Sequence, residues 1–422
     1  MRGAAISTGD RGMSDRRLAV VSYLANDPLT PRGTRTKALV KALERHWAIE
    51  LHSSSALHAA PDRRAAVRRA RKVVAGVSKR LILDPQEPWS YHRFGSWKPQ
   101  VDGALLIGWP MSPLVYAAAR LRDVGIPYVI DVGDPWVLTN PGSTLRRPVI
   151  ARAARAERVL WSGAGGAVVT TKAQADAFRS LYPDLPILIR PSGYQGVNIA
   201  AGDRARRKRA QQAEQTLKLL NFGTLYMSLV DVSQVLARLV DSGLWREVKF
   251  THFGHAWPGA LERASLKTTV STHPPVPWEE AVALARDHDV AVVLGTRPTF
   301  RMRLPSKAAQ YLTLPIPRLA ISSGADGDEL GHYVNGKPGW LCCSIDDPRL
   351  PERLRSHVSR EWSQAELAPP VGESWARVAD EVAAFVNSVL SRNADTPSRS
   401  RRGARVLGGP RRRRASAVSA RS

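Results

Sequence analysis

The chain has 422 residues, 43% of them hydrophobic, and a formal net charge of +25 at pH 7. This length allows two domains of ordinary size, each with its own core. The charge predicts an acidic partner, which is a nucleic acid, an anionic membrane face or a phosphorylated substrate. The two cysteines, Cys342 and Cys343, are adjacent, which argues against a disulfide scaffold and a zinc site and indicates free thiols in a reducing cytosol. No apolar run approaches 18 residues, so we expect no transmembrane helix.

The first half of the chain alternates short apolar runs with helical patterns. Residues 17–23 form an apolar strand pattern that leads into a turn-rich loop at 26–33 and then into a helix with Leu39, Val40 and Leu43 on one face. This order is the opening of a doubly wound parallel sheet. The pattern continues with a helix at 113–124 and with strands at 48–51, 102–108, 126–132, 166–171 and 187–190.

A second set of strands follows a basic polar segment at 200–215, which has the composition of a linker. The expected strands are 217–223, 248–254, 268–271, 289–295 and 318–321, with a helix at 278–288 and a late amphipathic helix at 375–390. We therefore predict two α/β domains with parallel sheets, facing one cleft where ligands bind at the carboxyl ends of the strands. The predicted boundaries are a flexible leader at 1–16, a first domain at 17–199, a linker at 200–215, a second domain at 216–368, a C-terminal helix at 369–390 and a disordered basic tail at 391–422.

The segment RMRLPSKAAQYL, residues 301–312, is the best candidate for a binding site. It follows a buried-strand pattern, and Pro305 and Ser306 are typical of a helix start. The free N–H groups and positive dipole end of a helix attract anions, and Arg301, Arg303 and Lys307 add full charges suited to a diphosphate leaving group. The alternative is an ordinary strand-to-helix turn with a basic rim.

Much of the positive charge is concentrated in three stretches, at 63–80, 204–209 and 392–422. The last has ten arginines against one acid, Asp395, and lacks apolar periodicity. The first and the last of these stretches suit contact with an anionic membrane surface. The chain has no recognition motif for nucleic acid and no dinucleotide or P-loop signature, so a nucleic-acid-binding protein is the weaker alternative.

Six segments, taken in order, resemble the GT-B glycosyltransferases of glycosyltransferase family 4, and the resemblance spans about residues 18–386. RLPSKAAQYL resembles the family's lPsKlfEYl, and IRPSGYQ resembles its crossover signature iPNGyd. The other four segments are PLTPRGTRTKALVKAL, IPYVIDVGDPWV, VVTTKAQADAF and NFGTLY. Two residues depart from the pattern: Gln310 stands where the family has an acid that contacts the donor ribose, and Ser192 replaces the usual Asn.

The resemblance implies an α/β fold of GT-B type, with two Rossmann-like domains that hold the acceptor and a nucleotide-diphosphate sugar respectively. It implies transfer with retention to a glycan or lipid-linked acceptor in cell-surface polysaccharide synthesis, without a metal or other cofactor. The protein is then expected to be cytoplasmic, with a possible peripheral contact at the inner face of the membrane. A GT-B scaffold that binds sugar nucleotides without turnover is the alternative that Gln310 suggests.

Further site candidates follow strand ends. Asp134 is a candidate to accept the acceptor's proton or hold a sugar hydroxyl, or it simply caps a loop. Gly223 and Gly33 permit close backbone approach to a ligand, or only make turns. Glu329 is a candidate for the donor ribose, within a loop whose acids also suit helix capping. The catalytic candidates are therefore Asp134, Arg303 and Lys307, and the donor-binding candidates are Gly33, Gly223, Arg301, Ser306, Gln310 and Glu329. His252 and His255 flank Gly254 without a visible third metal ligand, so they are expected to line the cleft or to be structural.

Overall fold

The structure is a computed structural model of the chain. It describes residues 16–23, 25, 31–53, 97–108, 111–134, 147–195, 216–225, 229–256, 268–297, 302–324 and 328–394. Arg301, the basic stretches at 63–80 and 204–209, the predicted linker, nearly all of the predicted leader and most of the predicted tail lie outside these residues.

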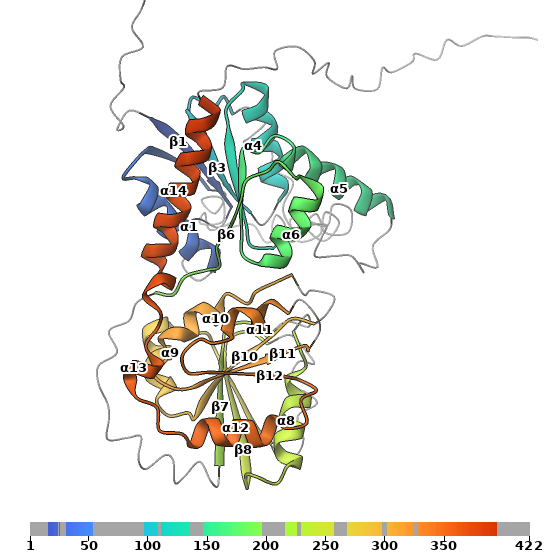
Figure 1. The fold of residues 1–422 in the computed structure, drawn as a ribbon, viewed down its shortest axis with the longest axis vertical. Helices are drawn as coiled ribbons and strands as arrows, with labels where there is room; N and C mark the ends of the chain where they lie inside the picture. The colour runs from blue at the N-terminus through green and yellow to red at the C-terminus, as the bar shows by residue number, and fades with distance from the viewer. Residues whose placement is uncertain are drawn as a thin grey trace, which may run out of the picture.

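The described residues form two α/β domains, each built on a sheet of six parallel strands (Figure 1). The first sheet has the order β2-β1-β3-β4-β5-β6, and the second has the order β12-β11-β10-β7-β8-β9. Parallel strands need crossover helices, and these cover both faces of each sheet. The predicted doubly wound fold, with two similar domains in one chain, is therefore confirmed.

The first sheet is apolar on both faces because helices bury both. Strands β3, β4 and β5 are buried along their whole length. One face packs on α4, α5 and α6, and the other packs on α1 and α14. The elements are β1 (Arg17–Ser22), α1 (Pro31–Leu43), β2 (Ala48–His52), β3 (Gly103–Ile107), α4 (Ser112–Asp123), β4 (Tyr128–Val132), α5 (Arg147–Trp161), β5 (Gly166–Val169), α6 (Lys172–Leu181) and β6 (Ile187–Ile189).

The second domain repeats this plan. One face of its sheet packs on α8 and α12, and the other packs on α9, the α10–η5 turn and α11. The elements are β7 (Thr216–Phe222), α8 (Val232–Asp241), β8 (Glu247–Phe253), β9 (Thr268–His273), α9 (Trp278–Ala285), β10 (Val290–Leu294), α10 (Lys307–Gln310), η5 (Tyr311–Thr313), β11 (Arg318–Ser322), α11 (Glu329–Val334), β12 (Trp340–Ser344), α12 (Leu350–Ser359), α13 (Gln364–Leu367) and η6 (Val371–Glu373). The sequence did not indicate β12, an edge strand whose residues are mostly half-buried.

The C-terminal helix α14 (Trp375–Ala394) leaves the second domain and runs along the first (Figure 1). It fits closely because two glycines lie beneath it. A Cβ at Gly103 would lie 2.6 Å from Leu390 Cδ1, and one at Gly166 would lie 3.0 Å from Val389 Cγ2. The last helix therefore completes the core of the domain with which the chain begins.

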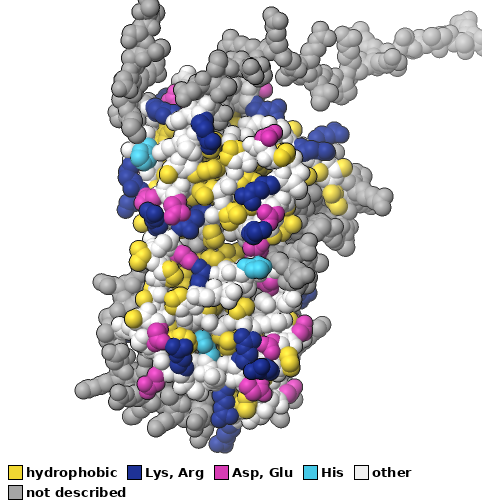
Figure 2. Space-filling view, in the orientation of Figure 1, with side chains coloured by type: hydrophobic (Ala, Val, Ile, Leu, Met, Phe, Trp, Pro, Cys, Tyr) yellow, Lys and Arg dark blue, Asp and Glu magenta, His cyan; other side chains and the backbone are white. Residues whose placement is uncertain are grey.

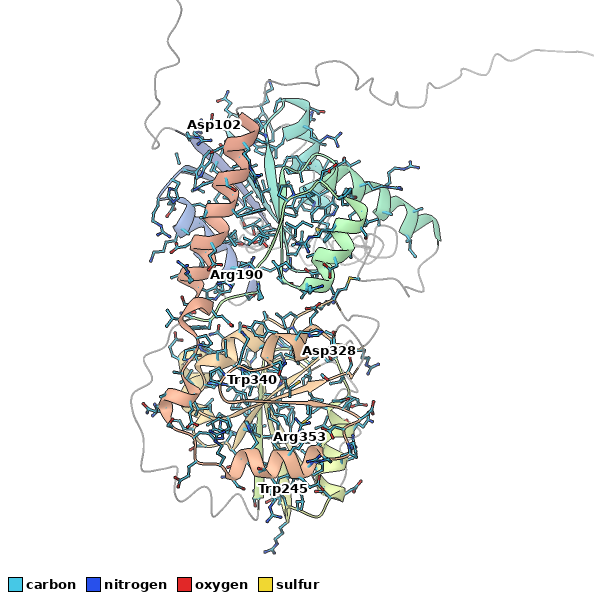
Figure 3. The ribbon with its side chains drawn as sticks, in the orientation of Figure 1. Asp102, Arg190, Trp245, Asp328, Trp340 and Arg353 are labelled. Atoms are coloured by element: carbon cyan, nitrogen blue, oxygen red, sulfur yellow. The ribbon has the colours of Figure 1, made fainter. Side chains whose placement is uncertain are left out.

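The chain crosses between the domains twice, and the two crossings are bonded to each other. Tyr194 donates its backbone N–H to Glu373 O at 3.0 Å, and Trp375 donates to Tyr194 O at 3.0 Å. Arg190 lies at this junction (Figure 3) and forms an ion pair with Glu381 of α14 at 3.0 Å. These contacts fix the two sheets with their carboxyl ends facing each other.

Candidate functional site

The helix start that the sequence indicates after Pro305 and Ser306 is the start of the α10–η5 turn in the second domain. α10 begins at Lys307, but it has four residues and continues as a single 3-10 turn. Ser306 is in the N-cap position, yet its side chain makes no capping hydrogen bond. The predicted helix start is correct, but so short a helix has only a small dipole, and the charge of Lys307 is the main attraction for an anion.

This turn is fastened to the end of β7 by Tyr311. The Tyr311 hydroxyl accepts a hydrogen bond from the backbone N–H of Phe222 at 2.5 Å, and the ring is fully buried. Ala308 and Ala309 are also buried beneath the turn. Since the lower face is apolar and fixed, Lys307 is held against the carboxyl end of β7.

Arg318 fixes the other end of the same turn. This side chain is fully buried and donates to the carbonyl oxygens of Tyr311, Leu312 and Leu314 at 2.7–2.8 Å. It also reaches Pro338 O and Leu367 O. Burial lowers the pKa of Arg318 to about 9, so it stays a cation at neutral pH and donates to carbonyls at the end of the turn. Sequence reasoning missed Arg318, because an arginine that begins a strand has no signature of such a role.

Lys307 and Gly223 meet at the carboxyl edge of the second sheet. Lys307 Nζ donates to Thr224 O at 3.4 Å, and a Cβ at Gly223 would lie 3.9 Å from Nζ. Gly223 has a φ of +95°, which favours glycine, and its backbone is exposed. Lys307 is partly buried rather than solvent-facing, and desolvation lowers its pKa from 10.5 to about 8. Among the described residues no carboxylate forms an ion pair with Lys307, so its charge is available to an anionic ligand.

Two buried polar residues lie beneath this edge. His252 of β8 and Asn221 of β7 are both fully buried, and their side chains are joined by a 3.0 Å hydrogen bond. Burial, together with the charge of nearby Lys307, lowers the pKa of His252 to about 4. His252 is therefore a buried, neutral residue at the base of the site, whereas His255 is exposed.

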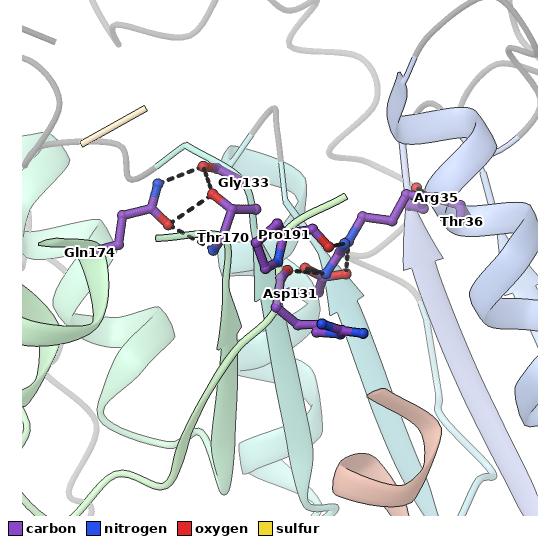
Figure 4. A network of polar contacts seen from close by, with 9 residues as sticks. Arg35, Thr36, Asp131, Gly133, Thr170, Gln174 and Pro191 are labelled. Atoms are coloured by element: carbon purple, nitrogen blue, oxygen red, sulfur yellow. Dashed lines mark hydrogen bonds and ion pairs between the residues drawn. The ribbon is translucent and has the colours of Figure 1, made fainter. Parts of the chain in front are cut away.

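On the first domain, the most buried ion pair is Arg35 with Asp131 (Figure 4). Arg35 Nε and Nη2 donate to the two carboxylate oxygens at 2.7 and 3.0 Å. The same guanidinium reaches Pro191 O at 3.3 Å and Arg190 O at 3.4 Å, both on the crossing between the domains. The pair thus ties α1, the end of β4 and the crossing together. Neither residue was among the predicted site residues.

Asp134 lies between arginines of both domains. Its carboxylate is 3.1 Å from Arg32 Nη2, at the start of α1, and 3.5 Å from Arg303 Nε. The structure therefore brings two predicted catalytic residues, Asp134 and Arg303, into one ion-paired cluster. In this arrangement Arg303 contacts a carboxylate of the opposite domain rather than pointing freely at a ligand.

Further hydrogen bonds join the facing edges. Gln174 of α6 donates to Gly133 O at 2.7 Å and to Met302 O at 2.9 Å, and the Thr171 hydroxyl donates to Met302 O at 3.1 Å. Glu329 accepts the backbone N–H of Ala173 at 2.7 Å, so its carboxylate caps α6 across the domain boundary. Burial raises the pKa of Glu329.

Three predicted site residues remain, Gln310, Gly33 and Arg301. Gln310 Oε1 accepts from the backbone N–H of Gln195 at 3.4 Å, on the first crossing between the domains. We expected Gly33 in the loop at 26–33. It is instead the third residue of helix α1. Arg301 is outside the described residues.

Two general features of the described part bear on the site. No group of three or more His, Cys, Asp or Glu side chains with metal-binding geometry occurs within the described ranges. Within the same ranges, no helix is long and apolar enough to cross a membrane.

On the face shown in Figure 2, basic and acidic side chains are interspersed over both domains.

No protein-family model matches the chain, and no curated protein matches its sequence. Among solved structures, the alpha,alpha-trehalose 6-phosphate synthase from Burkholderia multivorans is similar, with a TM-score of 0.51 and 12% identity over 90% of this chain and 99% of that chain. A putative UDP-N-acetylglucosamine 2-epimerase from Listeria monocytogenes has a TM-score of 0.50 and 11% identity over 90% and 98% of the two chains. These similarities establish the GT-B architecture of two Rossmann-like domains.

Proposed function

We propose that this protein is a glycosyltransferase whose second domain binds a nucleotide-diphosphate sugar. The observation that supports this most directly is Lys307, a desolvated cation beside the exposed backbone of Gly223. Burial of a cation without a carboxylate partner is unfavourable, and a diphosphate would supply the missing counter-charge. The position also fits the rule that ligands of parallel α/β sheets bind at the carboxyl ends of strands.

In this proposal the enzyme acts by positioning and by stabilising charge. The bond from the sugar's anomeric carbon to the diphosphate breaks, the acceptor oxygen bonds to that carbon, and the departing phosphate takes the acceptor's proton. Lys307 stabilises the negative charge that develops on the diphosphate. Retention follows because attack and departure occur on the same face, and the charge of Lys307 takes the place of a metal ion.

The first domain then faces the acceptor. Asp134 is held by Arg32 and Arg303 at 3.1 and 3.5 Å, so its proposed role is to orient an acceptor hydroxyl or to hold Arg303 near the donor. We propose a glycan or lipid-linked acceptor in cell-surface polysaccharide synthesis, used at the cytoplasmic face of the membrane. The basic stretches at 63–80 and 392–422 are the proposed contacts with anionic lipid.

The test begins with a thermal-shift screen against UDP-, GDP-, ADP- and dTDP-sugars, followed by measurement of nucleoside diphosphate release with glycan and lipid-linked acceptors. Lys307→Met should weaken binding of the selected nucleotide by about 10- to 150-fold, as expected for a lost hydrogen bond to a charged group worth roughly 1.5–3 kcal/mol. Lys218→Met is the matched control, because Lys218 is an exposed lysine at the opposite end of β7.

Acceptor-dependent release that persists in EDTA, with a retained anomeric configuration in the product, is the expected result. Tight binding without release would favour the scaffold that has lost catalysis. Conversion of the sugar nucleotide without an acceptor would replace the transferase proposal by an isomerase or a hydrolase.

A further inference from the structure

Asn221 and His252 are unexpected residues for the places they occupy. They face each other in register on the neighbouring parallel strands β7 and β8, and both are fully buried. Burial of an amide and an imidazole is unfavourable unless both are hydrogen-bonded, and such strands are usually apolar throughout. The pair lies two residues before Gly223 and Gly254, at the edge where Lys307 lies.

The hydrogen bonds of the pair determine which imidazole nitrogen holds the proton. Asn221 Nδ2 donates to Val292 O at 2.7 Å, which leaves the amide oxygen to face His252. That oxygen can only accept, so His252 Nδ1, 3.0 Å away, is the protonated nitrogen. Because the ring is neutral, Nε2 has a free lone pair. Nε2 is buried and has no hydrogen-bond partner among the described residues.

Lys307 is a neighbouring residue whose ammonium group makes fewer hydrogen bonds among the described residues than it has N–H donors. Its ammonium group has three N–H donors, and its hydrogen bond among the described residues is the long one to Thr224 O, at 3.4 Å. The ionisable groups that act on His252 are Lys307 and His255, and Lys307 has the larger effect. An unsatisfied acceptor two residues before Gly254 and an incompletely bonded donor beside Gly223 therefore lie at the same carboxyl edge of the sheet.

We propose that His252 is a positioning residue for Lys307: its Nε2 accepts a hydrogen bond from the ammonium when a nucleoside diphosphate binds, and thereby directs the other N–H groups at the ligand. A neutral acceptor suits this role because it orients the cation without cancelling its charge. A carboxylate in the same place would form an ion pair with Lys307 and compete with the ligand. This inference rests on the proposed function, since it requires an anionic ligand at Lys307.

The test compares His252→Leu, His252→Gln and a matched control, His357→Leu. His357 is half-buried, its pKa is likewise lowered to about 4, and its Nε2 also has no hydrogen-bond partner among the described residues, but the charged groups that act on it are Arg360 and Arg318. The probe is whichever of UDP, GDP, ADP or dTDP binds the wild-type protein most tightly. Its dissociation constant is measured by calorimetry from pH 7.5 to 10, where the terminal phosphate is fully ionised.

We expect His252→Leu to weaken binding at pH 7.5 about tenfold. It should also lower the pH at which the alkaline fall of affinity levels off by half a unit or more, because a hydrogen bond to the ammonium in the complex raises the pKa of Lys307 there. His252→Gln, which keeps an acceptor, should restore part of both losses, and His357→Leu should change neither. Unfolding measurements on all three variants confirm that binding is measured on folded protein.

If His252→Leu and His357→Leu both bind like the wild type across the pH range, the positioning role is wrong while the anion site stands. The same conclusion holds if the two variants lose affinity equally. If no nucleoside diphosphate binds the wild type, the proposed function and this inference are both overturned.

Discussion

The arginines at the edge of the first domain and Lys307 at the facing edge of the second domain differ in their partners. On the first domain, Arg35 and Arg32 are each matched by a carboxylate, Asp131 and Asp134. On the second, Lys307 contacts a backbone carbonyl, and His252, on which its charge acts, is kept neutral by burial. The first edge therefore neutralises its arginines internally, whereas among the described residues the charge of Lys307 has no carboxylate partner.

The largest effect should come from breaking the buried pair of the first domain. Asp131→Leu leaves the Arg35 guanidinium buried without its counter-charge, which should lower the free energy of unfolding by about 3–5 kcal/mol. Urea unfolding measures the change. The double variant Asp131→Leu with Arg35→Met should recover much of that loss, because it removes both charges. Equal instability of the single and double variants would contradict this account of the pair.

A smaller effect should appear when the second domain is acidified. The pKa of His252 falls from 6.5 to about 4 on folding, so between these values the unfolded chain binds a proton that the folded protein does not. The stabilisation from neutral His252 should therefore be fully present above pH 6.5. The free energy of unfolding should fall by about 3 kcal/mol as the pH drops to 4.

His357 adds a loss of the same sign, so the measurement is a difference between proteins. His252→Gln should lose about 3 kcal/mol less stability than the wild type between pH 6.5 and 4. Parallel stability curves for the two proteins would show that His252 is not held neutral by the fold.

The smallest effect should come from the partly exposed cluster that joins the two edges. Asp134 is about one-third exposed, so Asp134→Asn should change the free energy of unfolding by at most about 1 kcal/mol. Acceptor saturation should change more than donor affinity, since the residue belongs to the first domain. Loss of donor binding with normal acceptor kinetics would assign Asp134 to the donor site instead.

The sequence was sufficient for elements whose signal is local. The apolar run of β10 and the glycine after β7 predicted a buried strand and a glycine turn, and the structure has both. The helix start at Lys307 was also correct. α10 has only four residues, so its dipole contributes less than that of a regular helix.

Features that depend on contacts far apart in the chain could not be predicted. Arg35 meets Asp131 across 96 positions, and α14 completes a core built from the first strands. His252 was expected to line the cleft or to be structural, but its pairing with Asn221 follows from the register of β7 and β8, which the sequence does not show. Glu329 is similar: its contact with Ala173 exists because the two domains meet.

The central claim is that Lys307 is a free cation that binds an anionic ligand. Because its pKa in the free protein is about 8 and an anion raises that value, nucleotide affinity should be constant from pH 7 to 8 and then fall by up to tenfold per pH unit. The measurement is the calorimetric dissociation constant of the selected nucleoside diphosphate from pH 7 to 10, for the wild type and for Lys307→Met. We predict a decline above pH 8 in the wild type and weak binding without that decline in the variant. Identical curves for the two proteins would contradict the claim.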